Sequence, residues 1–315
     1  MTDMLSFFWF LGSLPDLEKN QIAAHFDIMM SATPFPPTST VSVYPKTVLV
    51  KDDCLNVLRA LETNSVALIL IDPPYGAQTQ GQQTWDKAWT LAFWTDILAH
   101  IFRVLIPGGH MIVFASGKTI YSIHGNIELA YKATKQSKKL SHFRNIWQHE
   151  SRDSGRCHSH TPLSQFEDVL VYYREGEGKS MESKGTLCKS STFNQHVGQT
   201  NVLKYYKDDC QSKPWKAVQD FFSKNKAQGK HMSTFDYKPE ALMRGLIRTY
   251  SSPGHKVVDP CMRHGISAVA SFMEARDFLG VEMDPVSFGY GVFACREHLR
   301  IETGTNVRRA KAVEY

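Results

Sequence analysis

The stretch VALILIDPPYG, residues 66–76, indicates the fold class of this chain. Its first six residues are all apolar, which is typical of a strand that is buried on both faces by crossover helices. Asp72, two prolines and Tyr75 come next, so we expect them at the carboxyl edge of a parallel sheet, where ligands of such folds bind. The prolines fix φ and remove backbone donors, which leaves a rigid turn rich in acceptors. Asp-Pro-Pro is also a common turn, and its place after this strand makes it a candidate site.

Strand and helix patterns alternate around this stretch. A strand at 48–50 and a helix at 54–61 precede it. A helix at 91–105, stopped by Pro-Gly-Gly at 107–109, and a strand at 111–114 come after it. This alternation is typical of βαβ units with parallel strands. We therefore predict an α/β fold with a doubly wound, mostly parallel sheet.

A second βαβ unit is predicted in the last quarter of the chain. A helix at 241–250 leads into a strand at 256–258 and a turn at 259–265. A helix at 266–275 and a strand at 278–281 complete the unit. The pattern therefore predicts a second parallel pair of strands.

The charge of the chain is unevenly distributed. The 315 residues are 42% hydrophobic and carry a net charge of +5, an ordinary globular composition that excludes a disordered or collagen-like protein. Residues 118–240, where the pattern weakens apart from strands at 143–147 and 168–173, hold 20 basic and 13 acidic residues, so the excess is +7 there and −2 elsewhere. On charge alone, a solvated surface and a phosphate-binding face fit equally well. The candidate lysines are Lys132, Lys135, Lys138, Lys139, Lys204, Lys207, Lys213 and Lys216.

Six scattered cysteines form no Cys-x-x-Cys pair, so we predict free thiols in a reducing, cytoplasmic compartment and neither a disulfide framework nor a metal site. Cys157, His158 and His160 match no common metal-ligand spacing and are assigned to a loop. The apolar run at 5–14 is about half as long as a membrane span, so no membrane partner is expected.

Asp72-Pro73-Pro74-Tyr75 resembles the catalytic signature of the S-adenosylmethionine-dependent DNA amino-methyltransferases, the N6-adenine and N4-cytosine enzymes. Residues 52–55 and 103–109 resemble further motifs of this family, and residues 238–282 resemble its cofactor-binding half. The catalytic half precedes the cofactor half, which is the order of the circularly permuted β group. The resemblance covers about residues 47–290 and implies a Rossmann-like methyltransferase fold with a seven-stranded sheet.

The resemblance divides the chain into five parts. Residues 1–44 are an N-terminal extension, and residues 45–117 are the catalytic half of the methyltransferase domain. Residues 118–235 are an insert for target recognition and DNA binding that includes part of the core sheet. Residues 236–300 are the cofactor-binding half, and residues 301–315 are a tail.

The family's chemistry implies a role for each residue of the signature. An exocyclic amine of adenine or cytosine is a poor nucleophile, because its lone pair is delocalised into the ring. Asp72 and the carbonyl of Pro73, in the turn that Pro74 stiffens, are implied to accept the two amine hydrogens while Tyr75 stacks on the flipped-out base. Methyl transfer is then direct and needs no covalent enzyme intermediate.

The resemblance also implies residues that hold S-adenosylmethionine. Asp53 contacts the adenine, Glu282 accepts both ribose hydroxyls, and the glycine-containing turn before residue 266 admits the methionine part. Without the resemblance, Asp53 is equally a helix cap and Glu282 an exposed strand end. The implied cofactor-binding residues are Asp53, Lys238, Pro239, Asp259, Pro260, Gly265, Ser267 and Glu282.

Two positions depart from the family pattern, since Arg263 and Asp52 replace glycines. A side chain at position 263 would narrow the cofactor pocket or require another backbone path. We predict a site-specific DNA methyltransferase acting on adenine N6, because aspartate at the first motif position favours adenine. An N4-cytosine enzyme, a catalytically silent DNA-binding subunit and an RNA or protein methyltransferase stay open. A homodimer and a restriction-modification context stay open as well.

Overall fold

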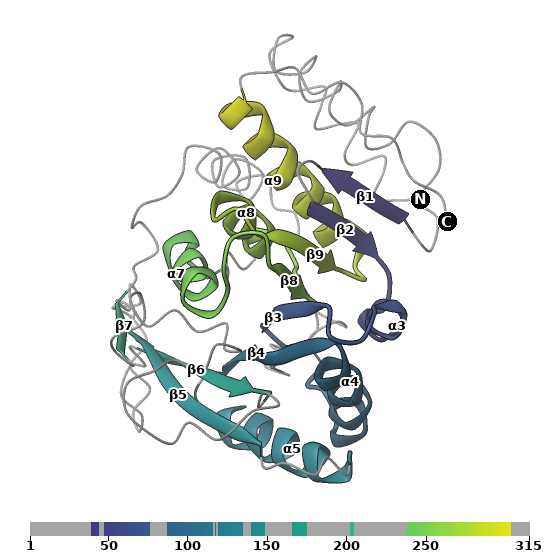
Figure 1. Ribbon diagram of the computed structural model, residues 1–315, viewed down its shortest axis with the longest axis vertical. Helices are drawn as coiled ribbons and strands as arrows, with labels where there is room; N and C mark the ends of the chain where they lie inside the picture. Colours follow the sequence, from purple (N-terminus) through teal and green to yellow (C-terminus); the bar gives the residue numbers. More distant parts are fainter. Residues whose placement is uncertain are drawn as a thin grey trace, which may run out of the picture. The chain divides into compact units, whose positions relative to one another are not determined.

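One mixed sheet forms the centre of the structure (Figure 1). Apart from Ser39, the described residues belong to one compact unit, residues 40–315. The computed structural model describes residues 39–43, 47–75, 87–115, 117, 119–134, 140–148, 166–174, 202–204 and 238–303.

The strands lie in the order β1-β2-β9-β8-β3-β4-β6-β5-β7 across the sheet. The pairs from β2 to β4 are parallel, and β6 is antiparallel to both of its neighbours. The predicted α/β fold with a mostly parallel sheet is thereby confirmed, and β1 and β7 extend seven central strands at the two edges. The strands are β1 (Ser39–Val43), β2 (Thr47–Lys51), β3 (Val66–Ile71), β4 (Leu105–Ala115), β5 (Ser141–Gln148), β6 (Phe166–Tyr173), β7 (Val202–Lys204), β8 (Lys256–Asp259) and β9 (Asp277–Val281).

The helices form two groups that cover the two faces of the sheet, as expected for a doubly wound fold (Figure 1). α3, α4 and α5 pack in one group, and α7, α8 and α9 pack in the other. Among the described residues, no helix has the length and apolar character that crossing a bilayer requires. The helices are α3 (Cys54–Ala60), α4 (Leu91–Val104), α5 (Thr119–Ala133), α7 (Glu240–Tyr250), α8 (Ile266–Met273) and α9 (Pro285–Thr303).

The hydrophobic core surrounds β3. All six of its side chains are at most 2% exposed. Ile69 belongs to a buried cluster with Leu58 of α3, Trp94 and Ile97 of α4, and Ile127 of α5. Burial of each aliphatic side chain of this kind contributes roughly 1.5–3 kcal/mol. The strand that leads into the candidate catalytic turn is therefore held firmly on both faces.

The Pro-Gly-Gly segment at 107–109 lies inside a strand, which differs from the prediction that it stops a helix. α4 already ends at Val104, and β4 begins at the next residue. A Cβ at Gly109 would lie 2.9 Å from the carbonyl oxygen of Ile106 and 3.0 Å from that of Ala67. Only glycine permits this approach of two backbones, which occurs where the register of β3 and β4 shifts.

Helix α5 lies where the sequence pattern weakens, and it was not predicted. Its buried face consists of Ile123, Ile127 and Ala130. Tyr121 and Leu129 are apolar residues of the same helix but are 82% and 55% exposed, so the apolar period is blurred. The core thus continues through α5, β5 and β6, within the region predicted as an insert.

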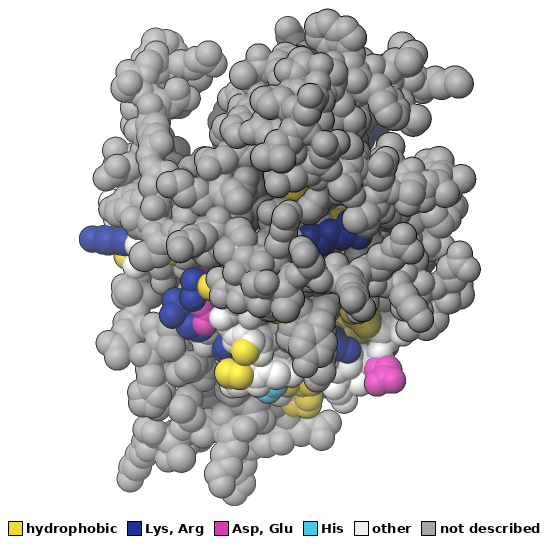
Figure 2. Space-filling view, turned by 90° about the horizontal axis from the view of Figure 1, so that it is seen from above, with side chains coloured by type: hydrophobic (Ala, Val, Ile, Leu, Met, Phe, Trp, Pro, Cys, Tyr) yellow, Lys and Arg dark blue, Asp and Glu magenta, His cyan; other side chains and the backbone are white. Residues whose placement is uncertain are grey.

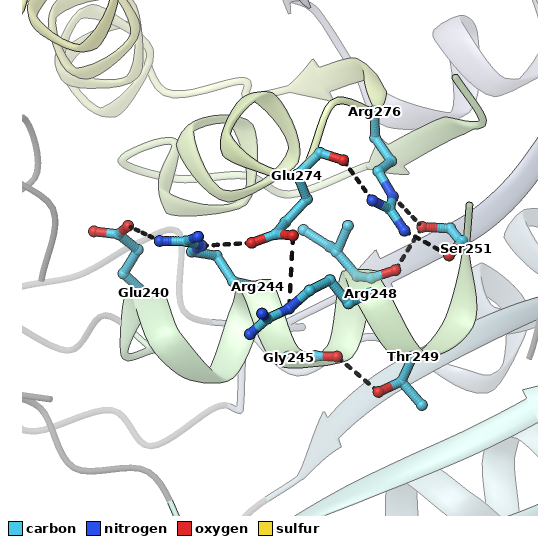
Figure 3. A network of polar contacts seen from close by, with 9 residues as sticks. Glu240, Arg244, Gly245, Arg248, Thr249, Ser251, Glu274 and Arg276 are labelled. Carbon is cyan, nitrogen blue, oxygen red and sulfur yellow. Dashed lines mark hydrogen bonds and ion pairs between the residues drawn. The ribbon is translucent and has the colours of Figure 1, made fainter. Parts of the chain in front are cut away.

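A network of ion pairs and hydrogen bonds joins α7 to the end of α8 (Figure 3). Glu274 accepts a hydrogen bond from Nε of Arg244 at 2.6 Å and pairs with Nε of Arg248 at 3.6 Å. Arg276 donates to the carbonyl oxygen of Ser251 at 2.6 Å, just beyond α7. The Glu274 carboxylate is only 9% exposed, so these contacts hold α7 in a defined position.

Candidate active site

Two Asp-Pro turns lie side by side at the carboxyl edge of the sheet. β3 and β8 are adjacent parallel strands, with Leu68 opposite Val257. Asp72 comes directly after β3, and Asp259 is the last residue of β8. The Sγ–H of Cys261 donates to the carbonyl oxygen of Asp72 at 3.4 Å. The structure therefore brings together the turn that was predicted to be catalytic and the turn that was predicted to hold the cofactor.

The carboxylate of Asp72 has a partner at each of its two oxygens. The hydroxyl of Tyr75 donates to Oδ1 at 2.6 Å, and Nζ of Lys238 lies 3.2 Å from Oδ2. The side chain of Asp72 is 34% exposed, whereas Pro73 is buried and Pro74 is half-buried. The turn thus presents a fixed acceptor that solvent or a substrate can still reach.

Lys238 lies against Asp72, a contact that was not predicted. Its Nζ also lies 2.9 Å from Oε2 of Glu167, a residue that the sequence did not point to. The Lys238 side chain is only 8% exposed, and its ammonium is 5.1 Å from the ring centre of Phe114 and 5.9 Å from that of Trp147. The only sequence signal that could have indicated Glu167 is its position directly before the predicted strand at 168–173.

Asp259 is buried, in contrast to Asp72. Its Oδ2 accepts from the Ser267 hydroxyl at 2.6 Å, and its Oδ1 accepts from the backbone N–H of Cys261 at 3.0 Å. Burial raises the pKa of Asp259 to about 7, although both hydrogen bonds act to lower it. Asp259 thus organises the turn between β8 and α8 from inside.

Glu282 comes directly after β9 and is tied to the same turn. Its Oε2 accepts from the backbone N–H of Arg263 at 3.0 Å, and its Oε1 accepts from that of Asp284 at 2.8 Å. Burial raises the pKa of Glu282. Each carboxylate oxygen has a second lone pair, so the group can accept further hydrogen bonds from a diol.

The turn between β8 and α8 passes through left-handed backbone at two positions. Gly265 has φ of 79°, and a Cβ there would lie 3.0 Å from Cα of Gly291 in α9. Arg263 has φ of 49°, so arginine takes the left-handed path that glycine adopts more readily. Pro260, at the start of the turn, is buried. The turn thus approaches α9 closely despite the side chain at position 263.

Asp53 caps α3, because its Oδ1 accepts from the backbone N–H of Leu55 at 2.7 Å. Asp52 in turn accepts from the backbone N–H of Asp53 at 2.6 Å. Pro239 stands immediately before α7 as its N-cap residue and is buried. The helix-cap interpretation of Asp53 is therefore correct, and its carboxylate keeps lone pairs that a ligand can use.

A small, partly open cavity lies between the two turns. Its lining includes Asp72, Lys238, Asp259, Arg263 and His264. Burial and, to a smaller extent, the positive charge of Arg263 lower the pKa of His264 to about 3, so the imidazole is neutral at physiological pH.

The cysteine thiols near this edge are held in their neutral form. Burial raises the pKa of Cys54 to about 12 and raises that of Cys261 well above its ordinary value. A thiol with a raised pKa is a weak nucleophile at neutral pH. These two side chains therefore suit packing and hydrogen bonding rather than covalent catalysis.

The candidate DNA-binding lysines fall mostly outside the described residues. Lys132 in the last turn of α5 and Lys204 at the end of β7 are described, and both are exposed. On the face seen in Figure 2, described Lys and Arg side chains emerge at several separate points. Lys135, Lys138, Lys139, Lys207, Lys213 and Lys216 lie outside the described residues.

Metal-ligating side chains do not cluster in the described part of the chain. Within the described ranges, no group of three or more His, Cys, Asp or Glu side chains is arranged to hold a metal ion. Cys157, His158 and His160 lie outside those ranges.

Comparison with protein families gives one match that spans most of this architecture. A family model of the N6/N4 methyltransferases, described as DNA methylase, matches residues 66–288. The matched segment begins at β3 and ends inside α9, so it includes both Asp-Pro turns.

Two characterised sequences and one solved structure are similar to the chain. A DNA adenine methyltransferase, YhdJ of Escherichia coli K12, is 23% identical over 274 residues, covering 84% of this chain and 88% of YhdJ. The type II methyltransferase M.HpaI of Haemophilus parainfluenzae is 26% identical over 231 residues, covering 69% of this chain and 64% of M.HpaI. The structure of the PvuII cytosine-N4-specific DNA methyltransferase superposes with a TM-score of 0.58 at 14% identity, over 85% of this chain and 96% of that one. This last likeness concerns the fold.

Proposed function

The chain belongs to the DNA methylase family of the N6/N4 amino-methyltransferases, and from this premise we propose that it transfers a methyl group from S-adenosylmethionine to N6 of adenine in DNA. The observation that carries the proposal is the turn at Asp72, directly after β3, which presents a partly exposed carboxylate and whose backbone carbonyl is bonded by Cys261 of the turn at Asp259. Residues 118–235 contribute the DNA contacts, which their excess of positive charge supports.

The acceptors of the Asp72 turn suit an exocyclic amine. Asp72 offers a carboxylate that is one-third exposed, and Pro73 offers a backbone carbonyl in a turn that the prolines keep rigid. Hydrogen bonds to both N–H groups hold the amine so that its lone pair faces the methyl donor. Tyr75, whose ring is half-buried next to Asp72, supplies the aromatic face for a base that has left the duplex.

The residues around the second turn fit S-adenosylmethionine. Asp259 and Arg263 of this turn line the cavity that Asp72 also lines, and Glu282 keeps lone pairs for a diol. Glu282 and Asp53 would hold the ribose and adenine, and the turn at Asp259 would hold the methionine part. When bound, the cofactor supplies an electrophilic methyl group on a sulfonium. The chain's own residues position the amine.

The order of the elements supports membership of the circularly permuted β group. β3 with Asp72 comes early in the chain, and β8 with Asp259 and β9 with Glu282 come late. The catalytic half thus precedes the cofactor half, although the two halves adjoin in the sheet.

The choice of adenine rests on the aspartate at the first motif position and on the name of YhdJ. The test incubates the purified chain with DNA and S-adenosylmethionine labelled on its methyl group, and then identifies the labelled nucleoside after digestion. We expect N6-methyladenine. Labelled N4-methylcytosine would contradict the adenine assignment, and a chain that binds the cofactor and DNA but labels no base would contradict the proposed activity.

A further inference from the structure

The buried ammonium of Lys238 connects two carboxylates that come from distant parts of the chain. Asp72 comes directly after β3, Glu167 is the second residue of β6, and Lys238 stands two residues before α7. β6 runs antiparallel to β4, so Asp168 lies opposite Ala115, the last residue of β4. The start of β6 therefore lies at the same sheet edge as the Asp72 turn.

The Lys238 side chain is buried, so its positive charge must be compensated by neighbouring groups. The ammonium of a lysine side chain that is only 8% exposed needs nearby partners, because an uncompensated buried charge is costly. The carboxylates of Asp72 at 3.2 Å and Glu167 at 2.9 Å meet this need from two sides. The faces of Phe114 and Trp147 adjoin the same ammonium, at distances typical of cation–π contacts. Lys238 is thus confined to one place next to Asp72.

Of the two contacts of the Asp72 carboxylate, one can be replaced when the target base binds and the other is kept. Tyr75 bonds Oδ1, but its ring is also the aromatic face for the base, so this hydrogen bond is the one that an incoming amine can replace. Lys238 bonds Oδ2 and is anchored on its other side by Glu167. The lysine contact therefore persists while the base enters.

The structure assigns to Lys238, anchored by Glu167, the role of positioning the Asp72 carboxylate toward the amine of the target base. This role rests on the proposed function. It matters because methyl transfer requires an in-line approach, and a displacement of about 1 Å in a reacting group can cost on the order of 100-fold in rate. Lys238 and Glu167 act through Asp72 and are positioning residues.

The first test measures single-turnover methyl transfer at saturating cofactor and DNA. Lys238→Met should lower the rate about 100-fold, because Asp72 loses its anchor. Lys238→Arg should be at least about tenfold faster than Lys238→Met, because it keeps the positive charge. Because the rate is measured at saturating cofactor, the loss is expected whatever change in S-adenosylmethionine affinity calorimetry finds in these variants. A parallel fall of rate, cofactor affinity and thermal stability in both variants would make Lys238 a packing residue and contradict the role.

The second test asks whether charge is what the lysine supplies. Lys238→Ala should be rescued by n-propylammonium and not by 1-propanol, which has the same number of heavy atoms. Equal rescue by both compounds would contradict the role. Failure of both compounds to rescue Lys238→Ala, together with an inactive Lys238→Arg, would contradict it as well.

The third test asks whether Glu167 acts through Lys238. Glu167→Gln should lower the single-turnover rate about tenfold in the wild-type background and less than about twofold in the Lys238→Met background. Additive losses would contradict the anchor. Glu274→Gln is the matched control, since it breaks the ion network between α7 and α8 instead: thermal stability should fall and the rate should stay within about twofold.

The wild-type chain separates the two levels of inference. If it transfers no methyl group to any base, the proposed function fails and this role fails with it. If wild type and Lys238→Met transfer at the same rate, the positioning role alone fails.

Discussion

The two turns each begin with Asp-Pro after an apolar strand and occupy adjacent places in the sheet, yet their carboxylates have opposite surroundings. Asp72 is one-third exposed and pairs with a cation, whereas Asp259 is buried among neutral donors. α8 packs over Asp259 and bonds it through Ser267, whereas Asp72 keeps an exposed side and pairs with Lys238. A motif at a strand end therefore acquires its role from the element that packs over it.

The largest effect is expected at the exposed turn. Asp72→Ala should lower the single-turnover rate of methyl transfer roughly 10⁴-fold, because the amine loses its charged acceptor. Cofactor affinity, measured by calorimetry, should stay within about threefold of wild type, since no cofactor contact is removed. Loss of both the rate and the cofactor affinity would mean that Asp72 organises its turn from inside, as Asp259 does. The two aspartates would then have the same structural role.

The buried turn should respond in stability. With its pKa raised from 3.8 to about 7, Asp259 keeps its proton in the folded chain between about pH 4 and pH 7 and loses it in the unfolded chain. Its contribution to stability is complete below about pH 4 and is lost as the pH rises through about 7. The stability of wild type should therefore fall relative to that of Asp259→Asn as the pH rises. Between pH 4 and pH 8 the difference in free energy of unfolding should change by on the order of 4 kcal/mol in favour of the variant.

Denaturant unfolding of both proteins across this pH range measures the difference. Parallel curves for wild type and Asp259→Asn would show that the Asp259 carboxyl is not held protonated, and the two turns would then be electrostatically alike.

Glu282 is bonded to the buried turn through the backbone N–H of Arg263 and is the residue proposed to hold the ribose. Glu282→Ala should weaken S-adenosylmethionine binding roughly 100-fold, because two charge-assisted hydrogen bonds to the ribose are lost. The calorimetric titration also separates an active enzyme from a silent subunit. Unchanged affinity in this variant, or no binding by wild type, would contradict the assignment of this turn to the cofactor.

The smallest effect is expected at the link between the turns. Cys261→Ala removes one weak S–H donor to the carbonyl of Asp72, so the single-turnover rate should fall by no more than about threefold. A much larger loss, with thermal stability intact, would show that the two turns act as one unit.

Local signals account for the features that could be predicted from the sequence. The apolar run of β3 and the residues after it lie within eleven positions, and they predict both the sheet and its functional edge. The contact between Lys238 and Glu167 spans 71 positions, and nothing in either neighbourhood indicates the other. α5 escaped prediction because exposed Tyr121 and Leu129 interrupt its apolar period. Contacts between residues far apart in the chain and helices with a weak apolar period are thus the features that could not be predicted from this sequence.

The left-handed backbone at Arg263 also bears on how the family could vary. Position 263 already has the φ that glycine adopts freely, and for arginine this conformation costs about 1 kcal/mol. Arginine and glycine codons differ by a single nucleotide in most cases. A lineage could therefore exchange the two residues in one mutational step without rebuilding the turn, so variation at this position can change the charge of the cavity that Arg263 lines while the scaffold is inherited intact.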